Sequence, residues 1–250
     1  MKVLFVGDVH NHMYMFKDVE KLDIKYNFDR IICLGDYVDD WFTDNHNSLE
    51  TLSNVINLKI NSPEKYTFLL GNHELSYLGY PCSGHQYELD NLVRLKLIEN
   101  IDNFELYTTI ELNNKTYYCS HAGFTNEYLI EELQPNDTNW QDNIHLLNKN
   151  KLDKLHLLTP CSAYRGGKYP YSSFVWADMR ELLYYQDELL IPNQIIGHTP
   201  MKDIYHHTMY NSDLYFIDTH STYRDGSPYG NKSYLIWCEN EFRTILNKEI

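Results

Sequence analysis

The sequence has no segment that is typical of a linker or of a repeat array. It contains no Ser/Gly tract, no proline run and no block of like charge, and no repeat at the period of a solenoid or propeller is apparent. We therefore expect one domain over residues 1–250, long enough to bury most of its unfolded surface. An ordinary apolar fraction of 43% excludes the disordered and fibrous classes.

Long hydrophobic runs are missing as well. No stretch approaches the roughly 20 apolar residues of a membrane-spanning helix, and the apolar run in Lys2–Val6 is too short for a signal peptide. The five cysteines lie far apart without metal-ligand spacing, and we expect Cys33 and Cys119 to be buried apolar residues. These absences predict a soluble, cytoplasmic protein without a membrane partner.

Positive charge is scarce. The chain has 21 Lys and Arg against 35 Asp and Glu, which gives a formal net charge of −14. Because such a surface repels the phosphate backbone, we do not expect long nucleic acid as a partner. Bound metal ions can still make one pocket cationic, and this would reconcile the acidic chain with a phosphate-bearing substrate.

Three short apolar runs in the first half each end in glycine followed by a polar side chain. They are Lys2–Val6 before Gly7-Asp8, Arg30–Leu34 before Gly35-Asp36, and Tyr66–Leu70 before Gly71-Asn72. Helical patterns over 13–22 and 47–60 lie between them. This βαβαβ order predicts a parallel central sheet.

The remaining chain mixes helices and strands. Residues 74–102 are predicted to be helical, a hairpin is predicted around Asn113-Asn114, and a mainly helical insertion is predicted around 126–175. Further strands are predicted over 194–197, 214–218, 233–238 and 242–246. We expect an α+β fold: a four-layer αββα sandwich with two mixed β-sheets face to face and helices outside.

The predicted strand ends carry oxygen and nitrogen ligands and no cysteine. Asp8, Asp36 and Asn72 follow three strands, His121 and His198 follow two later ones, and His10 comes two residues after Asp8. The carboxyl ends of parallel strands share one edge, where open α/β folds bind their ligands. Mixed carboxylate and imidazole ligation suits Mn²⁺, Fe or Zn²⁺ better than Mg²⁺ or Ca²⁺.

These residues stand in five motifs that follow one another in a fixed order. The motifs are Gly7-Asp8-Val9-His10, Gly35-Asp36-Tyr37-Val38-Asp39, Gly71-Asn72-His73-Glu74, His121-Ala122-Gly123 and Gly197-His198-Thr199-Pro200. In this respect the chain resembles the calcineurin-like metallophosphoesterases. It is most similar to their phosphoprotein-phosphatase branch, which includes bacterial, phage and diadenosine tetraphosphate-hydrolysing members.

The resemblance implies a site with two divalent metal ions, with Mn²⁺ as the first choice and Fe or Zn²⁺ as alternatives. The implied ligands are Asp8 and His10 for the first metal, Asp36 as the bridge, and Asn72, His121 and His198 for the second metal. It further implies that a metal-activated hydroxide attacks phosphorus, while His73, oriented by Asp39, protonates the departing oxygen. Glu74 is predicted to be a helix-start residue.

The chain departs from this branch at the arginine that grips phosphate. The usual GD-x-VDRG is altered because Asp40-Trp41 stands where the branch has Arg-Gly. Arg165 and Arg180 are the candidates for a replacement substrate-binding cation, although surface arginines without such a role are common. His220 stands where bacterial members often have glycine. A role in facing the substrate and a role in capping the turn are the two alternatives, and we expect the cap.

We expect a metal-dependent hydrolase of phosphoester or phosphoanhydride bonds that acts on a small phosphorylated molecule or a nucleotide. Tyr80 and His85 are candidates for shaping such a pocket. A Ser/Thr phosphoprotein phosphatase is the alternative, and a phosphoprotein is then the partner. A nuclease is disfavoured by the acidic charge, and a non-catalytic scaffold by the presence of all six ligands and His73. The preference for monoesters or diesters and the oligomeric state stay open.

Overall fold

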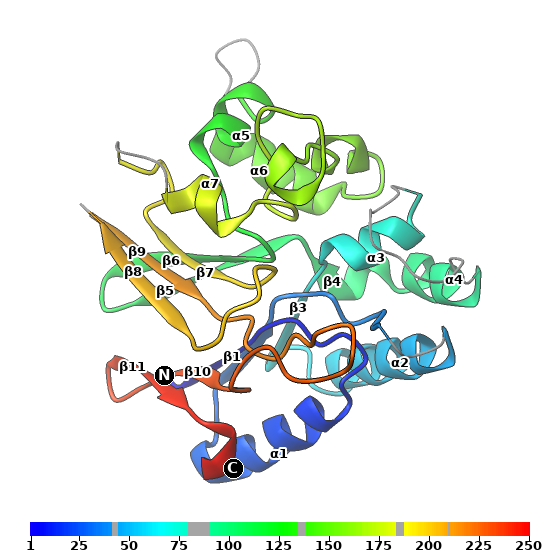
Figure 1. The fold of residues 1–250 in the computed structure, drawn as a ribbon, viewed down its shortest axis with the longest axis vertical. Helices are drawn as coiled ribbons and strands as arrows, with labels where there is room; N and C mark the ends of the chain where they lie inside the picture. Colours follow the sequence, from blue (N-terminus) through cyan, green and yellow to red (C-terminus); the bar gives the residue numbers. More distant parts are fainter. Residues whose placement is uncertain (42–44, 80–90, 135–138, 184–187, 210) are drawn as a thin grey trace.

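The computed structural model describes the chain except for residues 42–44, 80–90, 135–138, 184–187 and 210. Two β-sheets lie face to face in the middle of the molecule, with helices on both outer faces (Figure 1). This confirms the expected four-layer arrangement. Among the described residues, no helix is long and apolar enough to cross a lipid bilayer.

The first sheet has the strand order β11-β10-β1-β2-β3-β4. Its strands are β1 (Val3–Val6), β2 (Arg30–Cys33), β3 (Tyr66–Leu69), β4 (Phe104–Glu105), β10 (Tyr234–Cys238) and β11 (Glu241–Ile245). Strands β1 to β4 run parallel, as the βαβαβ pattern predicts, and β10 and β11 add antiparallel pairs. The two-residue β4 was not predicted.

The second sheet has the order β5-β6-β7-β9-β8. Its strands are β5 (Tyr107–Leu112), β6 (Lys115–Ser120), β7 (Asn193–Ile196), β8 (Tyr205–Met209) and β9 (Ser212–Phe216). The predicted hairpin joins β5 to β6, and its Asn113 and Asn114 both have positive φ, as a two-residue turn of this kind requires. The sequence did not predict β8 because this edge strand is mostly exposed and has no alternating apolar pattern.

The helices lie outside the two sheets. They are α1 (Tyr14–Tyr26), α2 (Asn45–Asn61), α3 (Asn72–Tyr77), α4 (Asn91–Glu99), α5 (Asn126–Glu131), α6 (Trp140–Lys149) and α7 (Met179–Leu183). Helix α1 buries Met15, Val19 and Leu22, which share one face at helical spacing. The described part of residues 126–175 contains α5, α6 and two short 3₁₀ turns, and the status of this segment as an insertion in a single domain stays a prediction.

The space between the sheets is filled by apolar side chains from both of them. Phe5 and Ile32 of the first sheet pack in one cluster with Ile195 and Tyr215 of the second. A larger cluster joins the helices to the outer face of the first sheet. Strands β1, β2 and β3 run parallel in the first sheet, and β6 and β7 run parallel in the second, so the loops that leave these strands open at one edge of each sheet.

Candidate metal centre

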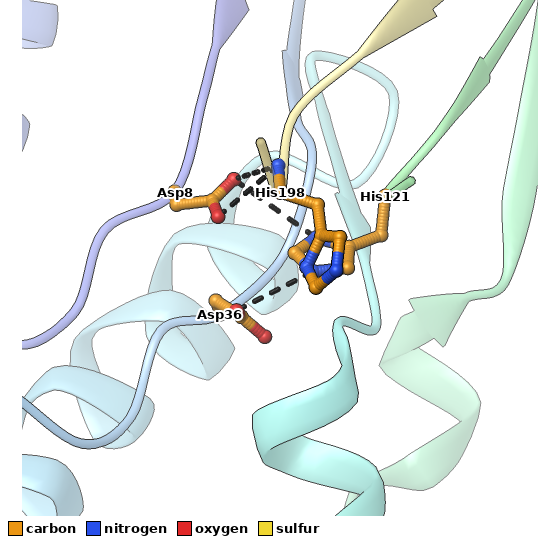
Figure 2. Close-up of side chains that lie close together, drawn as sticks. All are labelled: Asp8, Asp36, His121 and His198. Carbon is orange, nitrogen blue, oxygen red and sulfur yellow. Dashed lines mark hydrogen bonds and ion pairs between the residues drawn. The ribbon is translucent and has the colours of Figure 1, made fainter. Parts of the chain in front are cut away.

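The ligands predicted at separate strand ends come together in the structure. Asp8 follows β1, Asp36 follows β2, His121 follows β6 and His198 follows β7, and Figure 2 shows these side chains converging. Each offers one ligand atom within 4.8 Å of the others, and all four residues are buried. A second group at the same spacing contains His10, Asp36 and His73. Asp36 thus belongs to both groups, in the position predicted for a bridging carboxylate.

Asn72 completes the buried side of the site. Its Oδ1 lies 2.9 Å from His121 Nε2, which is also 3.1 Å from His198 Nδ1 and 3.3 Å from Asp36 Oδ2. The other nitrogen of His121, Nδ1, donates to the carbonyl oxygen of Leu34 at 2.9 Å. This hydrogen bond fixes the ring so that Nε2 faces the ligand atoms, the usual arrangement for a metal-binding histidine.

His10 is oriented in the same way on the opposite side. Its Nδ1 donates to the backbone oxygen of Asp39 at 2.9 Å. Its Nε2 points between Asp8 Oδ2 at 3.9 Å and Asp36 Oδ2 at 3.7 Å. Asp8, His10 and Asp36 are therefore close enough to form the predicted first ligand set.

The unpartnered atoms of the site fit a cation. His198 Nε2 is buried and has no hydrogen-bond partner among the described residues. Around His121 Nε2, three lone-pair-bearing atoms converge from Asn72, His198 and Asp36, and one imidazole proton cannot satisfy all of them. Buried oxygens and nitrogens that converge without donors are what a divalent ion needs, so the donor set fits the metals that the sequence predicts.

The backbone at the site is held in rarely populated conformations. His10, Asp36, Asp39 and His198 have φ values of 43°, 50°, 62° and 62°, in the left-handed region that non-glycine residues seldom adopt. Each costs on the order of 1 kcal/mol or more and persists only where the surroundings hold it.

Close approach of the loops depends on two glycines. A Cβ on Gly71 would collide with Asp36 Oδ1, and a Cβ on Gly197 would collide with Asp8 Oδ1. Because glycine has no Cβ, a backbone N–H close to each glycine can approach the carboxylate and donate a hydrogen bond to it. His73 N donates to Asp36 Oδ1 at 3.0 Å, and His198 N donates to Asp8 Oδ1 at 2.9 Å.

Glu74 ties the two central loops together. Its fully buried carboxylate accepts hydrogen bonds from the backbone nitrogens of Asp36 and Gly71 at Oε2, both at 2.9 Å. Oε1 accepts from Tyr37 N at 2.7 Å and Val38 N at 3.1 Å. Glu74 does stand in the first turn of α3, as predicted, but the sequence did not indicate this second role as an anchor of the loop that carries Asp36.

The electrostatics of the site place opposite charges in contact. Burial raises the pKa of Asp36, but His121 and His73 lower it more, so this carboxylate is ionised. Burial lowers the pKa values of His121 and His73, but Asp36 together with a second carboxylate, Asp8 at His121 and Asp39 at His73, raises both to about 9. Burial keeps the pKa of His198 well below its usual value. A cation at His121 must displace a proton, so metal binding is expected to weaken as the pH falls.

His73 is oriented by Asp39, the pair that the sequence singled out for catalysis. His73 Nδ1 lies 3.1 Å from Asp39 Oδ2, and Asp39 Oδ1 accepts the hydroxyl proton of Tyr77 at 2.6 Å. Tyr77 holds the carboxylate, which in turn holds the imidazole ring. His73 also lines the open pocket over the metal ligands, so its ring can reach a bound molecule.

The family follows from a comparison with known proteins. A family model described as calcineurin-like phosphoesterase matches residues 1–202. The chain belongs to this family. This family membership agrees with the metal-ligand candidates found at the strand ends and with the resemblance seen in the sequence motifs.

Two curated relatives are protein phosphatases by name. A protein phosphatase 2A catalytic subunit of Dictyostelium discoideum is 38% identical over 126 residues, which are 49% of this chain and 38% of that protein. The serine/threonine-protein phosphatase 6 catalytic subunit of Drosophila melanogaster is 23% identical over 211 residues, 80% of this chain and 58% of that protein. The chain therefore matches between 38% and 58% of the length of these two relatives.

Solved structures share the fold at low identity. A cold-active protein-tyrosine phosphatase of a psychrophilic Shewanella species aligns with a TM-score of 0.59 at 15% identity, over 100% of this chain and 78% of that one. A protein serine/threonine phosphatase of Saccharomyces cerevisiae aligns with a TM-score of 0.55 at 14% identity, over 98% and 80%. At such identities these matches show the common fold alone.

The two candidate arginines of this calcineurin-like phosphoesterase lie in different places. Arg165 lines the pocket over the ligands, where its Nη2 donates to Thr199 Oγ1 at 2.8 Å and its Nε pairs with Asp178 Oδ2 at 3.0 Å. Arg180 is not among the described residues that line this pocket. It binds both oxygens of Asp178 at 2.7 and 3.1 Å and covers the ring of Tyr164, and so it supports Arg165 indirectly.

One carboxylate of the site was missed by the sequence analysis. Asp218 follows β9 and is fully buried. Burial is the largest cause that raises the pKa of Asp8, and the negative charge of Asp218 is the second largest. Its Oδ2 accepts from Ser221 Oγ at 2.7 Å. The signal was present, because Asp218 is the last residue of a predicted strand, much as Asp8 and Asp36 follow theirs, but no glycine precedes it. Tyr80 and His85, the candidates for shaping a substrate pocket, lie outside the described residues.

Proposed function

We propose that this chain is a metal-dependent hydrolase of phosphoester or phosphoanhydride bonds. The observation that carries the proposal is the position of Asp36, one ionised carboxylate shared by two ligand groups at the floor of an open pocket. A shared carboxylate holds two cations close together, the arrangement of two-metal phosphoryl-transfer sites. Family membership supports the same chemistry.

The metal ligands are proposed residue by residue. Asp8 and His10 would hold one ion, Asp36 would touch both, and Asn72, His121 and His198 would hold the other. When bound, two divalent cations supply Lewis acidity to phosphoryl oxygens and lower the pKa of a water molecule. Mn²⁺ is our first choice because the oxygen and imidazole donors suit it, and Fe and Zn²⁺ are the alternatives.

His73 is proposed as the general acid. Asp39 accepts a hydrogen bond from the Nδ1–H of His73 and keeps the ring in one orientation. Nε2 is then free to donate its proton to the departing oxygen of the substrate. In the metal-free protein burial lowers the pKa of His73, but Asp36 and Asp39 together raise it to about 9, so the ring holds a proton that it can donate. Asp39 is a positioning residue because it acts through His73.

A small phosphorylated molecule or a nucleotide is the favoured substrate. The pocket has a volume of about 300 Å³, at the lower end of the range for small-molecule sites. Arg165 supplies the guanidinium that this pocket offers a phosphate. Asp40, where related enzymes grip phosphate with arginine, lines the same pocket and repels a second anionic group.

A serine/threonine phosphoprotein phosphatase is the second candidate. It is supported by the names of the curated relatives, which match at 38% and 23% identity. Asp40 at the arginine position argues against the same mode of phosphate recognition. A phosphoserine peptide therefore belongs in the first assay.

The test uses protein that is stripped of metal and reloaded with Mn²⁺. Turnover of p-nitrophenyl phosphate, bis-p-nitrophenyl phosphate and a phosphoserine peptide would be compared with turnover by the stripped protein. We expect metal-dependent hydrolysis of at least one nitrophenyl ester and slower hydrolysis of the peptide. Fast hydrolysis of the peptide alone would favour the phosphoprotein phosphatase. No turnover of any of the three, despite two bound ions per chain, would refute the enzyme and favour a non-catalytic scaffold.

A further inference from the structure

Trp41 is fixed at the rim of the pocket by contacts with a distant loop. Its indole Nε1–H donates to the backbone oxygen of Thr222 at 3.2 Å. The guanidinium of Arg224 lies over the ring, 5.0 Å from its centroid. These two contacts join the loop after β2 to the loop after β9 and hold the indole plane in place.

The indole of Trp41 belongs to the lining of the pocket. Trp41 and Thr222 line the pocket, whereas Arg224 is not among the described residues that do so. The guanidinium therefore covers the indole from outside the pocket. A cation over one face of an aromatic ring holds the ring in a fixed orientation. A flat aromatic surface that is fixed in this way is suited to stacking with a planar group of a bound molecule.

Asp40 places a hydrogen-bond acceptor beside this surface. One of its oxygens accepts from Trp41 N at 2.6 Å, and the other lies 3.4 Å from His12 Nε2. Each carboxylate oxygen has a second lone pair, so Asp40 can accept a further hydrogen bond from a bound molecule. Asp40 also lines the pocket. A group that approaches this side must bring donors rather than a second phosphate.

We propose that Trp41 is a specificity-determining residue on which the base of a nucleotide substrate stacks, while Asp40 accepts a hydrogen bond from the base or ribose. The phosphate then lies over the metal ligands beside Arg165. The proposal rests on the proposed function and names its substrate class. The ring of a phosphotyrosine could also stack on Trp41, but this ring itself carries no N–H or O–H donor beside Asp40, as a base does, and so a nucleotide fits better.

The test compares phosphate esters that differ in the group attached to phosphate. KM and kcat of the Mn²⁺-loaded enzyme would be measured with adenosine 5′-monophosphate, ribose 5-phosphate and phosphotyrosine. We expect the lowest KM for the nucleotide. In Trp41→Ala the preference for the nucleotide over ribose 5-phosphate should fall by about tenfold, since base–aromatic stacking contributes on that scale. Trp41→Phe keeps an aromatic ring and should retain most of the preference.

A matched control and a binding measurement separate the possible outcomes. Tyr223, an exposed aromatic residue of the same loop as Thr222, does not belong to the described lining, and Tyr223→Ala should keep the preference. An unchanged preference in Trp41→Ala, or an equal loss of activity on all three esters, would overturn the role of Trp41. A lower KM for phosphotyrosine than for the nucleotide would overturn the substrate class.

Failure of the proposed function would look different. If the wild-type protein turned over none of the three esters, the hydrolase would be refuted. Binding of adenosine 5′-monophosphate, measured by calorimetry, would then test the stacking on Trp41 independently of catalysis. Binding that Trp41→Ala weakens about tenfold would support the platform, and binding that is equal in both proteins would overturn it.

Discussion

The substitution Glu74→Gln tests the anchor between the loops that follow β2 and β3. The change keeps the size of the side chain but replaces one carboxylate oxygen by an amide NH₂. Glu74 is fully buried, and each of its oxygens accepts two backbone N–H groups. Whichever way the amide turns, two N–H groups therefore lose their acceptor and face a donor.

The four hydrogen bonds set the size of the effect. A hydrogen bond to a charged group contributes about 1.5–3 kcal/mol, so the loss of two would cost roughly 3–6 kcal/mol. Removal of a charge near Asp36 offsets a part of this loss, because Asp36 raises the pKa of Glu74 after burial itself. We expect a net destabilisation of about 3 kcal/mol, which lowers the Tm of a chain of this size by roughly 6–12 °C.

Thermal unfolding of the metal-stripped proteins measures this loss without a contribution from ligand binding. Glu249→Gln is the matched control, since Glu249 also stands three residues after the N-cap of a helix, but it is exposed and its carboxylate accepts a hydrogen bond from Leu246 N. We expect the control to change the Tm by no more than about 2 °C. A Glu74→Gln protein with the Tm of the wild type would refute the anchoring role.

Three further predictions concern the site and one ion-pair cluster. His73→Ala should lower kcat by about 10²–10⁴-fold with both metals still bound, as measured by elemental analysis, and unchanged turnover would remove His73 from the acid role. Arg165→Ala should raise KM for a phosphate ester by at least about tenfold, whereas Arg180→Ala should change it by less than about threefold, and equal effects would contradict the pocket assignment. At Asp213, burial raises the pKa, but hydrogen bonds from three neighbouring side chains lower it more, so it stabilises the fold above its unfolded pKa of about 3.9 and less as the pH falls below that value. Asp213→Asn should therefore be less stable than the wild type at pH 7, with a gap that closes toward pH 2 in urea unfolding curves, and a gap that stays constant with pH would rule out the charge as its cause.

The sequence predicted much of the sheet framework because its signals there are local. Short apolar runs that end in glycine and a polar residue marked β1, β2 and β3, and Asn113-Asn114 marked a turn that needs two positive φ values. The exposed edge strand β8 has no such pattern, since its partner in the sheet rather than its own composition makes it a strand.

By itself the sequence determined which residue types stand at the strand ends, and from them the family and the candidate metal ligands. That was possible because the motifs are short and each ligand is adjacent to its strand. Only the tertiary structure decided which side chains face the site from far along the chain. Arg165 rather than Arg180 lines the pocket, Asp218 joins Asp8, and Trp41 meets Thr222. Such placements depend on how two sheets pack and on which buried charges find partners, and these contacts leave no local pattern in the chain.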